Sequence, residues 1–269
     1  MFSMMDLKSD AEKLPRISLK ASRDFRHFLN SLVSNTNDLV LQRGDLGDFY
    51  EGTNTELLRD NHLNHALFMS SVFAVNGFDV LAKTLPWVYR AYASRGLTDK
   101  YFPLVIQSFM DGVEKYLEEK EARELTAVYQ WMLDHHTSVL ELSRSSAEPS
   151  PPVDPGYIHL KAEFLQGLLT GNTAACMEVA RKVTGGEQGI ENLYLNIIQP
   201  AMYEVGNLWE SNEISVATEH LASAIVTRVL GSIEYSGDAG ISTLGRGRVI
   251  VTTCSSEFHE IGAWMVSDV

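Results

Sequence analysis

The sequence predicts a mainly α-helical protein with two helical parts and one strand–loop–helix unit at its C-terminal end. Apolar residues recur with a period near 3.6 on both sides of a proline-rich segment. Very short turns join the helical segments that follow the prolines. Near the end, residues 248–254 form a β-branched run after a glycine-rich stretch, which is typical of a buried parallel strand.

Composition and charge are those of an ordinary globular protein. Of the 269 residues 45% are hydrophobic and 21% are charged, and the formal net charge is −13. This length suggests about two domains, each able to bury a core. Residues 1–147 have a net charge of −4 and the remainder −9, so neither half is basic. An acidic chain is a poor partner for nucleic acid phosphates or anionic lipid, and we expect it to bind neither directly.

The cysteines and the N-terminal residues indicate the cellular compartment in which the protein is expected. Cys176 and Cys254 are the only cysteines, and no CxxC pair occurs, which favours a reducing cytoplasm. The first 14 residues lack the continuous apolar stretch of a signal peptide. No apolar run reaches the roughly 18 residues that a membrane span needs. We therefore expect a soluble cytoplasmic protein.

Residues 1–145 are predicted to form a helical domain of about five to seven helices. One core-facing stripe consists of Phe102, Val105, Phe109, Val113 and Tyr116. A second helix is predicted over residues 125–142. Pro86 and Pro103 are expected near helix starts, where a missing N–H costs nothing.

The rest of the chain contains two predicted linkers. Residues 146–156 hold four of the eight prolines and form the first, and the Gly- and Ser-rich residues 236–246 form the second. Between them, four helices over 157–170, 172–184, 188–211 and 214–235 predict an up-down bundle. Residues 247–269 contain the strand, a loop and a helix from residue 261. One such unit cannot bury a sheet alone, so we expect further chain to complete it.

A tryptophan, nine residues and a Glu-His pair span the turn between the last two helices of the predicted bundle. Trp209 precedes the turn, and Val216, Glu219 and His220 follow it. Val216 and His220 share a helix face as positions i and i+4. An indole, an aliphatic group and two polar groups in one place could cover a large flat ligand and hydrogen-bond to it. Alone, such a pattern is more often a hairpin with a core tryptophan.

A second motif, Glu-Phe-His-Glu-Ile-Gly at residues 257–262, directly follows the predicted strand. A histidine at the carboxyl end of a parallel strand lies where open α/β sheets bind ligands. The imidazole of His259 could bind a late transition metal such as cobalt, with Glu257 holding its other ring nitrogen. Gly262 would let the following helix approach a bulky ring closely. Alone, a loop histidine without a special role is the commoner case.

In this order and on these elements, the two motifs together resemble the cobalamin-binding module of methionine synthase, corrinoid carrier proteins and B12-dependent photoreceptor regulators. The likeness covers residues 157–269 and is carried by residues 207–210, 214–220 and 257–262. In that family a four-helix cap precedes a flavodoxin-like Rossmann domain. The resemblance implies that 157–235 is the cobalamin cap and that 247–269 is the first strand and helix of an incomplete Rossmann domain.

The resemblance also implies a role for each motif residue. His259 looks like the lower axial ligand of cobalt, which displaces the corrinoid's own base. Glu257 stands where the family usually has Asp. The residues that look like the upper face of a photoreceptor-type cap, near an adenosyl group, are Trp209, Val216, Glu219 and His220. This cap pattern is more typical of sensors than of methyl carriers and favours adenosylcobalamin over methylcobalamin.

Two departures from the family pattern matter. Some light sensors have a histidine directly after the tryptophan, which caps cobalt once light has removed the adenosyl group. Here that position is Glu210. The family also places the pocket for the cofactor's nucleotide tail on later strands. We therefore expect a chain ending at Val269 to hold cobalamin weakly or not at all.

The N-terminal half carries weaker signals. His62 and His65 lie at positions i and i+3 of one predicted helix, a spacing that could suit a metal or haem, although a core or surface role is commoner. Residues 85–117 faintly resemble globin-like sensor domains. No basic recognition helix is present, which argues against direct DNA binding.

Three functions stay open on the sequence. The first is a cobalamin-dependent sensor, light-responsive through adenosylcobalamin, whose helical half acts in a homo-oligomer or on a downstream signalling protein. The second is a corrinoid carrier subunit of a methyltransferase system. The third is a helical dimerisation or signalling module without bound corrinoid. No nucleophile–base–acid set or phosphate-cradling glycine loop occurs, so we name no catalytic residues and expect no independent hydrolase or kinase.

Overall fold

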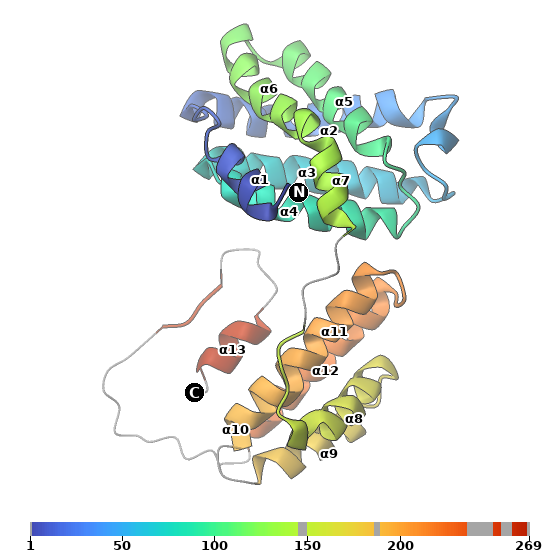
Figure 1. Cartoon of the computed structure of the whole chain (residues 1–269), viewed down its shortest axis with the longest axis vertical. Coiled ribbons are helices and arrows are strands. Elements are labelled where there is room, and N and C mark those ends of the chain that lie inside the picture. Colours follow the sequence, from blue (N-terminus) through green and yellow to red (C-terminus); the bar gives the residue numbers. More distant parts are fainter. Residues whose placement is uncertain (1, 145–149, 186–188, 236–249, 254–259, 268–269) are drawn as a thin grey trace. The chain divides into compact units, whose positions relative to one another are not determined.

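The computed structural model describes residues 2–144, 150–185, 189–235, 250–253 and 260–267. The protein is mainly helical, as predicted, and divides into two compact units, Met1–Ser146 and Ala147–Val269 (Figure 1). Within the described ranges the structure contains no β-strand, and an isolated antiparallel bridge joins Tyr50 to Leu97. None of the helices in these ranges is long and apolar enough to cross a membrane.

The first unit is a bundle of helices connected by short turns. Its elements are α1 (Met4–Ala11), α2 (Leu19–Leu41), the 3-10 turn η1 (Leu46–Asp48), α3 (Thr55–Val75), α4 (Phe78–Ala93), α5 (Tyr101–Tyr116), α6 (Glu119–Asp134) and α7 (His136–Ser143). The side chains of Ser18 and Asn54 accept backbone N–H bonds at the starts of α2 and α3. Asn76 ends α3 in the left-handed conformation, with a φ of 54°.

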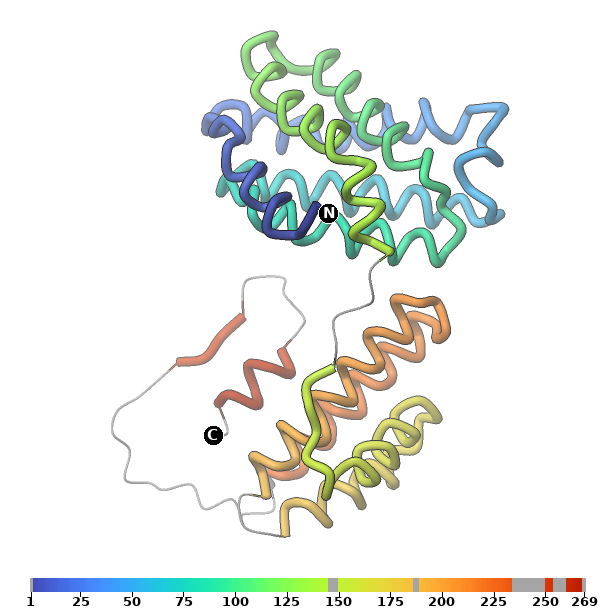
Figure 2. Tube along the Cα trace, in the orientation of Figure 1, coloured from blue at the N-terminus to red at the C-terminus, as the bar shows by residue number. Residues whose placement is uncertain are grey.

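Aromatic side chains form the core of the first unit. The helix α2 lies against α3, α5 and α6 (Figure 2). The ring of Phe25 on α2 meets that of Phe73 on α3 edge-on, with ring centroids 5.0 Å apart. Tyr129 of α6 contacts Phe73 and Phe109. Of the stripe predicted on α5, Phe102, Val105, Phe109 and Val113 are buried, and Tyr116 is partly buried against the same core.

Two sequence expectations for the first unit are wrong. Pro86 lies inside α4 and not near a helix start, and burial of the neighbouring Leu85 and Tyr89 keeps this helix in the core. The single helix expected over residues 125–142 is two helices, because α6 ends at Asp134 and α7 begins at His136. Pro103, by contrast, lies in the first turn of α5, as expected.

The second unit contains the four-helix bundle. Its elements are the 3-10 turn η2 (Pro155–Tyr157), α8 (Ile158–Leu169), α9 (Thr173–Thr184), α10 (Gly189–Asn192), the π-helix η3 (Leu193–Ile198), α11 (Gln199–Glu210), α12 (Val216–Tyr235) and α13 (Ile261–Ser267). These bounds agree with the predicted helices, and α10, η3 and α11 together occupy the predicted helix 188–211. The core between α8, α9, α11 and α12 includes Phe164, Val179, Ile197, Val205 and Val226.

The strand predicted over residues 248–254 is described only in its middle part. Residues 250–253 are described and have no regular secondary structure, while 248, 249 and 254 lie outside the described residues. The strand and the Rossmann domain therefore stay predictions. The helix α13 begins at Ile261, where the sequence predicts a helix, and contacts α12.

Candidate functional site

A tight turn between α11 and α12 brings the cap motif together. Asn212 has a φ of 61°, which lets the chain reverse, and the N–H of Glu213 donates to the carbonyl of Leu208 at 2.9 Å. The hydroxyl of Ser215 accepts from the N–H of Thr218 at 3.1 Å and caps the new helix. Trp209 at the end of α11 and the first turn of α12 therefore lie at the same end of the bundle.

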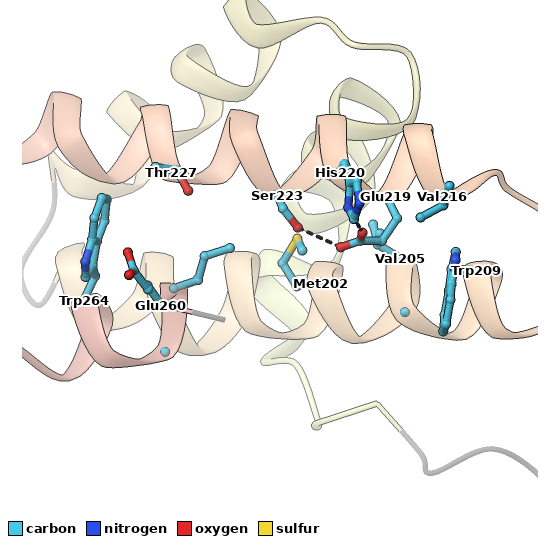
Figure 3. Close-up of a pocket in the computed structure, with 13 residues that line it drawn as sticks. Met202, Val205, Trp209, Val216, Glu219, His220, Ser223, Thr227, Glu260 and Trp264 are labelled. Atoms are coloured by element: carbon cyan, nitrogen blue, oxygen red, sulfur yellow. Dashed lines mark hydrogen bonds and ion pairs between the residues drawn. The ribbon is translucent and has the colours of Figure 1, made fainter. Parts of the chain in front are cut away.

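A cavity of about 550 Å³ lies between α11, α12 and the start of α13, a size typical of small-molecule sites. Figure 3 shows Trp209 and Val216 at one end and Thr227 and Trp264 at the other. The residues that line the cavity are Met202, Val205, Gly206, Trp209, Val216, Glu219, His220, Ser223, Thr227, Glu260, Ile261, Gly262 and Trp264.

Three side chains of α12 form a hydrogen-bonded chain on the cavity wall. The Nδ1 of His220 lies 2.6 Å from Oε2 of Glu219, and the hydroxyl of Ser223 donates to Oε1 of Glu219 at 2.8 Å (Figure 3). Because an ionised carboxylate only accepts, its partner Nδ1 carries the proton, and the Nε2 of a neutral His220 is left as an acceptor. The side chain of His220 is 74% exposed and that of Glu219 26%.

Two glycines leave the cavity open. A Cβ added at Gly206 on α11 or at Gly262 on α13 would meet no atom within 4 Å. A ligand can therefore approach the backbone at both positions without displacing a side chain. Together with Val205, Met202 and the indole of Trp209, Gly206 forms an apolar wall opposite the polar side chains of α12.

The comparison with known proteins bears on this unit. Residues 160–234 match the protein-family model described as B12 binding domain. The match supports a cobalamin-binding module over α8 to α12, the helices that carry most of the cavity. No curated protein and no solved structure matches the chain.

Most of the predicted site residues lie together at the cavity. Trp209, Val216, Glu219 and His220 line one cavity, and Gly262 of α13 lies in its wall. The other two predicted residues, Glu257 and His259, lie outside the described residues. Glu210, which directly follows Trp209, is buried and does not line the cavity.

Sequence reasoning missed several residues that line the cavity. Met202 and Gly206 lie seven and three positions before Trp209, which places them along α11 near the same face. Ser223 and Thr227 follow Glu219 at intervals of four, so helical spacing from the Glu-His pair could have found them. Trp264, two residues after Gly262, also lines the cavity.

The two histidines that the sequence singles out in the first unit, His62 and His65, pack among aromatic side chains of its core. The ring of His62 is fully buried and stacks on that of Tyr101, and its Nδ1 lies 2.7 Å from Oδ1 of Asn37. The ring of His65 packs against Phe109 and Tyr129. Among the described residues, no group of three or more His, Cys, Asp or Glu side chains could hold a metal ion. Aromatic packing is therefore what the structure assigns to this pair.

Proposed function

We propose that the protein is a cobalamin-dependent sensor that uses adenosylcobalamin, with the cofactor bound at the cavity between α11, α12 and α13. One observation carries the proposal. Residues from two sequence motifs, Trp209 and Glu219 from the first and Gly262 from the second, line a single cavity in a unit that matches the B12 binding domain.

The residues that line the cavity fit such a cofactor. Gly206 and Gly262 offer backbone that a flat macrocycle can approach, because a Cβ at either position meets only open space. Trp209 and Val216 would supply apolar surface that shields the upper face from water, and Val216 is 53% exposed. Glu219 and His220, which are hydrogen-bonded to each other on the cavity wall, would supply hydrogen bonds to the upper ligand.

The lower face of the cofactor is assigned by resemblance. His259 would bind cobalt from below, and Glu257 would hold the other nitrogen of its ring and raise its basicity. When bound, adenosylcobalamin supplies a cobalt–carbon bond that visible light cleaves. The protein's own part is to hold the upper group against α11 and α12, so that the cap packs differently once that group has gone.

We expect a titration, with adenosylcobalamin in the dark, of a version of the protein that carries the complete predicted Rossmann domain to give a bound spectrum in which histidine replaces the cofactor's own base. His259→Ala should abolish this spectrum and weaken binding at least about tenfold, since outer partners of a metal ligand alone are worth that much. His159→Ala, at an exposed histidine of α8 outside the cavity, is the matched control. Binding without any His259-dependent spectrum would contradict the proposed lower ligand.

Green light should change the elution volume of the dark complex in size-exclusion chromatography, because a sensor must couple loss of the upper ligand to packing or assembly. Trp209→Ala should weaken adenosylcobalamin binding and reduce this response. Identical elution in light and dark, together with tighter binding of methylcobalamin than adenosylcobalamin, would favour a corrinoid carrier instead.

Gly206 allows the cavity to be filled without disturbing the fold. Because its Cβ position is open, Gly206→Ala should stabilise α11 by about 0.5–1 kcal/mol. Gly206→Leu should fold equally well but extend into the cavity and weaken cobalamin binding at least about tenfold, a steric cost of only about 1.4 kcal/mol. Thermal unfolding and spectral titration of the two variants separate these effects. Unchanged binding by the leucine variant would place the ligand elsewhere.

A further inference from the structure

The second half of α3 carries an exposed face without charge. Residues 61–78 contain no Asp, Glu, Lys or Arg. Leu67 is 50% exposed and Val75 is 74% exposed, and Ser71 and Ala74 are exposed between them. The hydroxyl of Ser71 donates to the carbonyl of Leu67 at 3.1 Å, so its hydrogen bond is made within the helix. These four residues form an uncharged stripe, and such a stripe on the surface of a chain with a net charge of −13 is typical of a contact surface.

The first half of α2 carries a basic face. Arg16 lies just before the helix, and Arg23 and Arg26 follow on it at positions i and i+3. All three are exposed and make no ion pair within the described residues, and together they form an arginine row. Asp24 is the only acidic residue in this half of α2, and the ammonium nitrogen of Lys20 lies 3.1 Å from its carboxylate. The arginine row is therefore a local exception in an acidic chain.

The arginine row and the uncharged stripe lie on neighbouring helix halves. The N–H of Ile17, just before α2, donates at 2.6 Å to the side-chain oxygen of Asn76, which ends α3. Further along, Phe25 of α2 packs against Phe73 of α3. The start of α2 therefore lies beside the end of α3, and the two helices run antiparallel (Figure 2). Apolar surface next to arginine is a combination that protein interfaces favour.

We propose that the uncharged stripe and the arginine row bind an amphipathic helix of another protein, with apolar residues on one face and carboxylates along one edge. The apolar face of such a helix packs against an exposed apolar stripe. Arg23 and Arg26 lie about 4.5 Å apart along α2, which matches carboxylates at positions i and i+3 of a partner helix. Arginine binds a carboxylate through two parallel N–H bonds. This inference concerns the first unit and does not rest on the cobalamin site.

The charges around the arginine row favour a short acidic partner. At physiological salt, charges further apart than about 8 Å are largely screened, so the net charge of −13 does not keep an acidic helix from the three arginines. A nucleic acid or an anionic lipid surface extends beyond the row. It would also meet the acidic residues that flank the row, among them Glu118, whose carboxylate accepts from Lys20 at 3.3 Å.

The test measures the binding of two synthetic amphipathic peptides of about 18 residues, which is about five helical turns. Both have leucines on one face, and one has glutamates along the edge where the other has lysines. Fluorescence anisotropy with the full chain should show at least about tenfold tighter binding of the glutamate peptide, because lysines turn attraction into repulsion. Arg23→Glu combined with Arg26→Glu should abolish this preference. Leu67→Ser should weaken binding of the glutamate peptide about fivefold through lost apolar contact.

The matched controls repeat these changes at exposed residues outside the two faces. They are Lys100→Glu combined with Lys120→Glu, and Leu39→Ser on α2, and each should leave the affinities unchanged. Equal affinities for the two peptides, no binding of either, or a preference that survives the double arginine variant would each overturn the inference.

Two further measurements distinguish other partners. A dimer in sedimentation velocity that the double arginine variant dissociates would make a second copy of the chain the partner and overturn the inference. Arginine-dependent binding of single-stranded DNA or of phosphatidylserine vesicles would overturn it in favour of a polyanionic surface. The proposed cobalamin binding would stand in each case, because these variants lie in the first unit.

Discussion

Acidification from neutral pH to about pH 4 is expected to remove several kcal/mol from the unfolding free energy of the first unit. Burial lowers the pKa of His62 from 6.5 to about 4 and that of His65 from 6.5 to about 3. Their Nε2 atoms are buried without a hydrogen-bond partner among the described residues, so a proton added at Nε2 would find no acceptor there.

The direction of this effect follows from which state binds protons. Near pH 6.5 the histidines of the unfolded chain take up protons, while the buried rings stay neutral until the pH approaches 4 and 3. Stability is therefore fully present above pH 6.5 and falls as the pH decreases below it. At about 1.4 kcal/mol for each pKa unit, His62 alone contributes about 3 kcal/mol.

Urea unfolding between neutral pH and about pH 4 measures the effect. In a background with Trp209→Phe and Trp264→Phe, the fluorescence of Trp87 and Trp131 reports on the first unit alone. His65→Phe keeps an aromatic ring against Phe109 and Tyr129. It should make the unfolding free energy fall less steeply on acidification, while His62 keeps its own contribution. His27→Gln, at an exposed histidine of α2, is the control and should leave it unchanged. A slope that survives His65→Phe unaltered would rule out this source of acid sensitivity.

Gly167→Val is expected to destabilise the four-helix bundle by about 3 kcal/mol, because small-to-large changes in a packed core cost 1–3 kcal/mol or more. Gly167 is a buried residue of α8 where this helix packs against α9. A Cβ there would lie 2.7 Å from Sγ of the buried Cys176 and 3.3 Å from the carbonyl oxygen of Asn172. Neither neighbour can retreat freely, so α8 and α9 must separate.

The matched control is a second glycine in a helix of the same bundle. Gly206→Val has the same change in side chain and the same β-branching, but its Cβ meets no atom within 4 Å. Thermal unfolding of the chain, followed by far-ultraviolet circular dichroism, should show a large loss of stability for Gly167→Val and little for Gly206→Val. Equal losses for both would mean that helix propensity, and not the contact between α8 and α9, decides the outcome.

The helices of the bundle could be predicted well because the residues at their ends, which form turns and caps, determine where each helix begins and ends. Gly171 and Asn212 adopt positive φ values of 72° and 61° at two of the turns, and glycine and asparagine are the residues that tolerate this conformation. Asn172 then caps α9 through its side chain. Such signals act over a few residues and need no knowledge of the rest of the fold.

The candidate site could be predicted only in part. The convergence of Trp209 and His220 follows from a short turn between two helices, which is a local feature. Ser223 and Thr227 carried no signal of their own, because serine and threonine on a long helix commonly face solvent. Glu210 directly follows Trp209 on α11, yet only Trp209 lines the cavity, because successive residues of a helix point about 100° apart.

By itself, the sequence determined the helical class, the order and bounds of the bundle helices and the meeting of the cap motif at one end, because periodicity and turn chemistry are local properties. Only the tertiary structure decided that Pro86 lies within a helix, that His62 and His65 are buried without charge, and that one wall of the cavity is polar and the other apolar. Each of these depends on which residues from distant parts of the chain exclude water from a given face. Burial of a given face therefore depends on several helices at once and cannot be read from the sequence of any one of them.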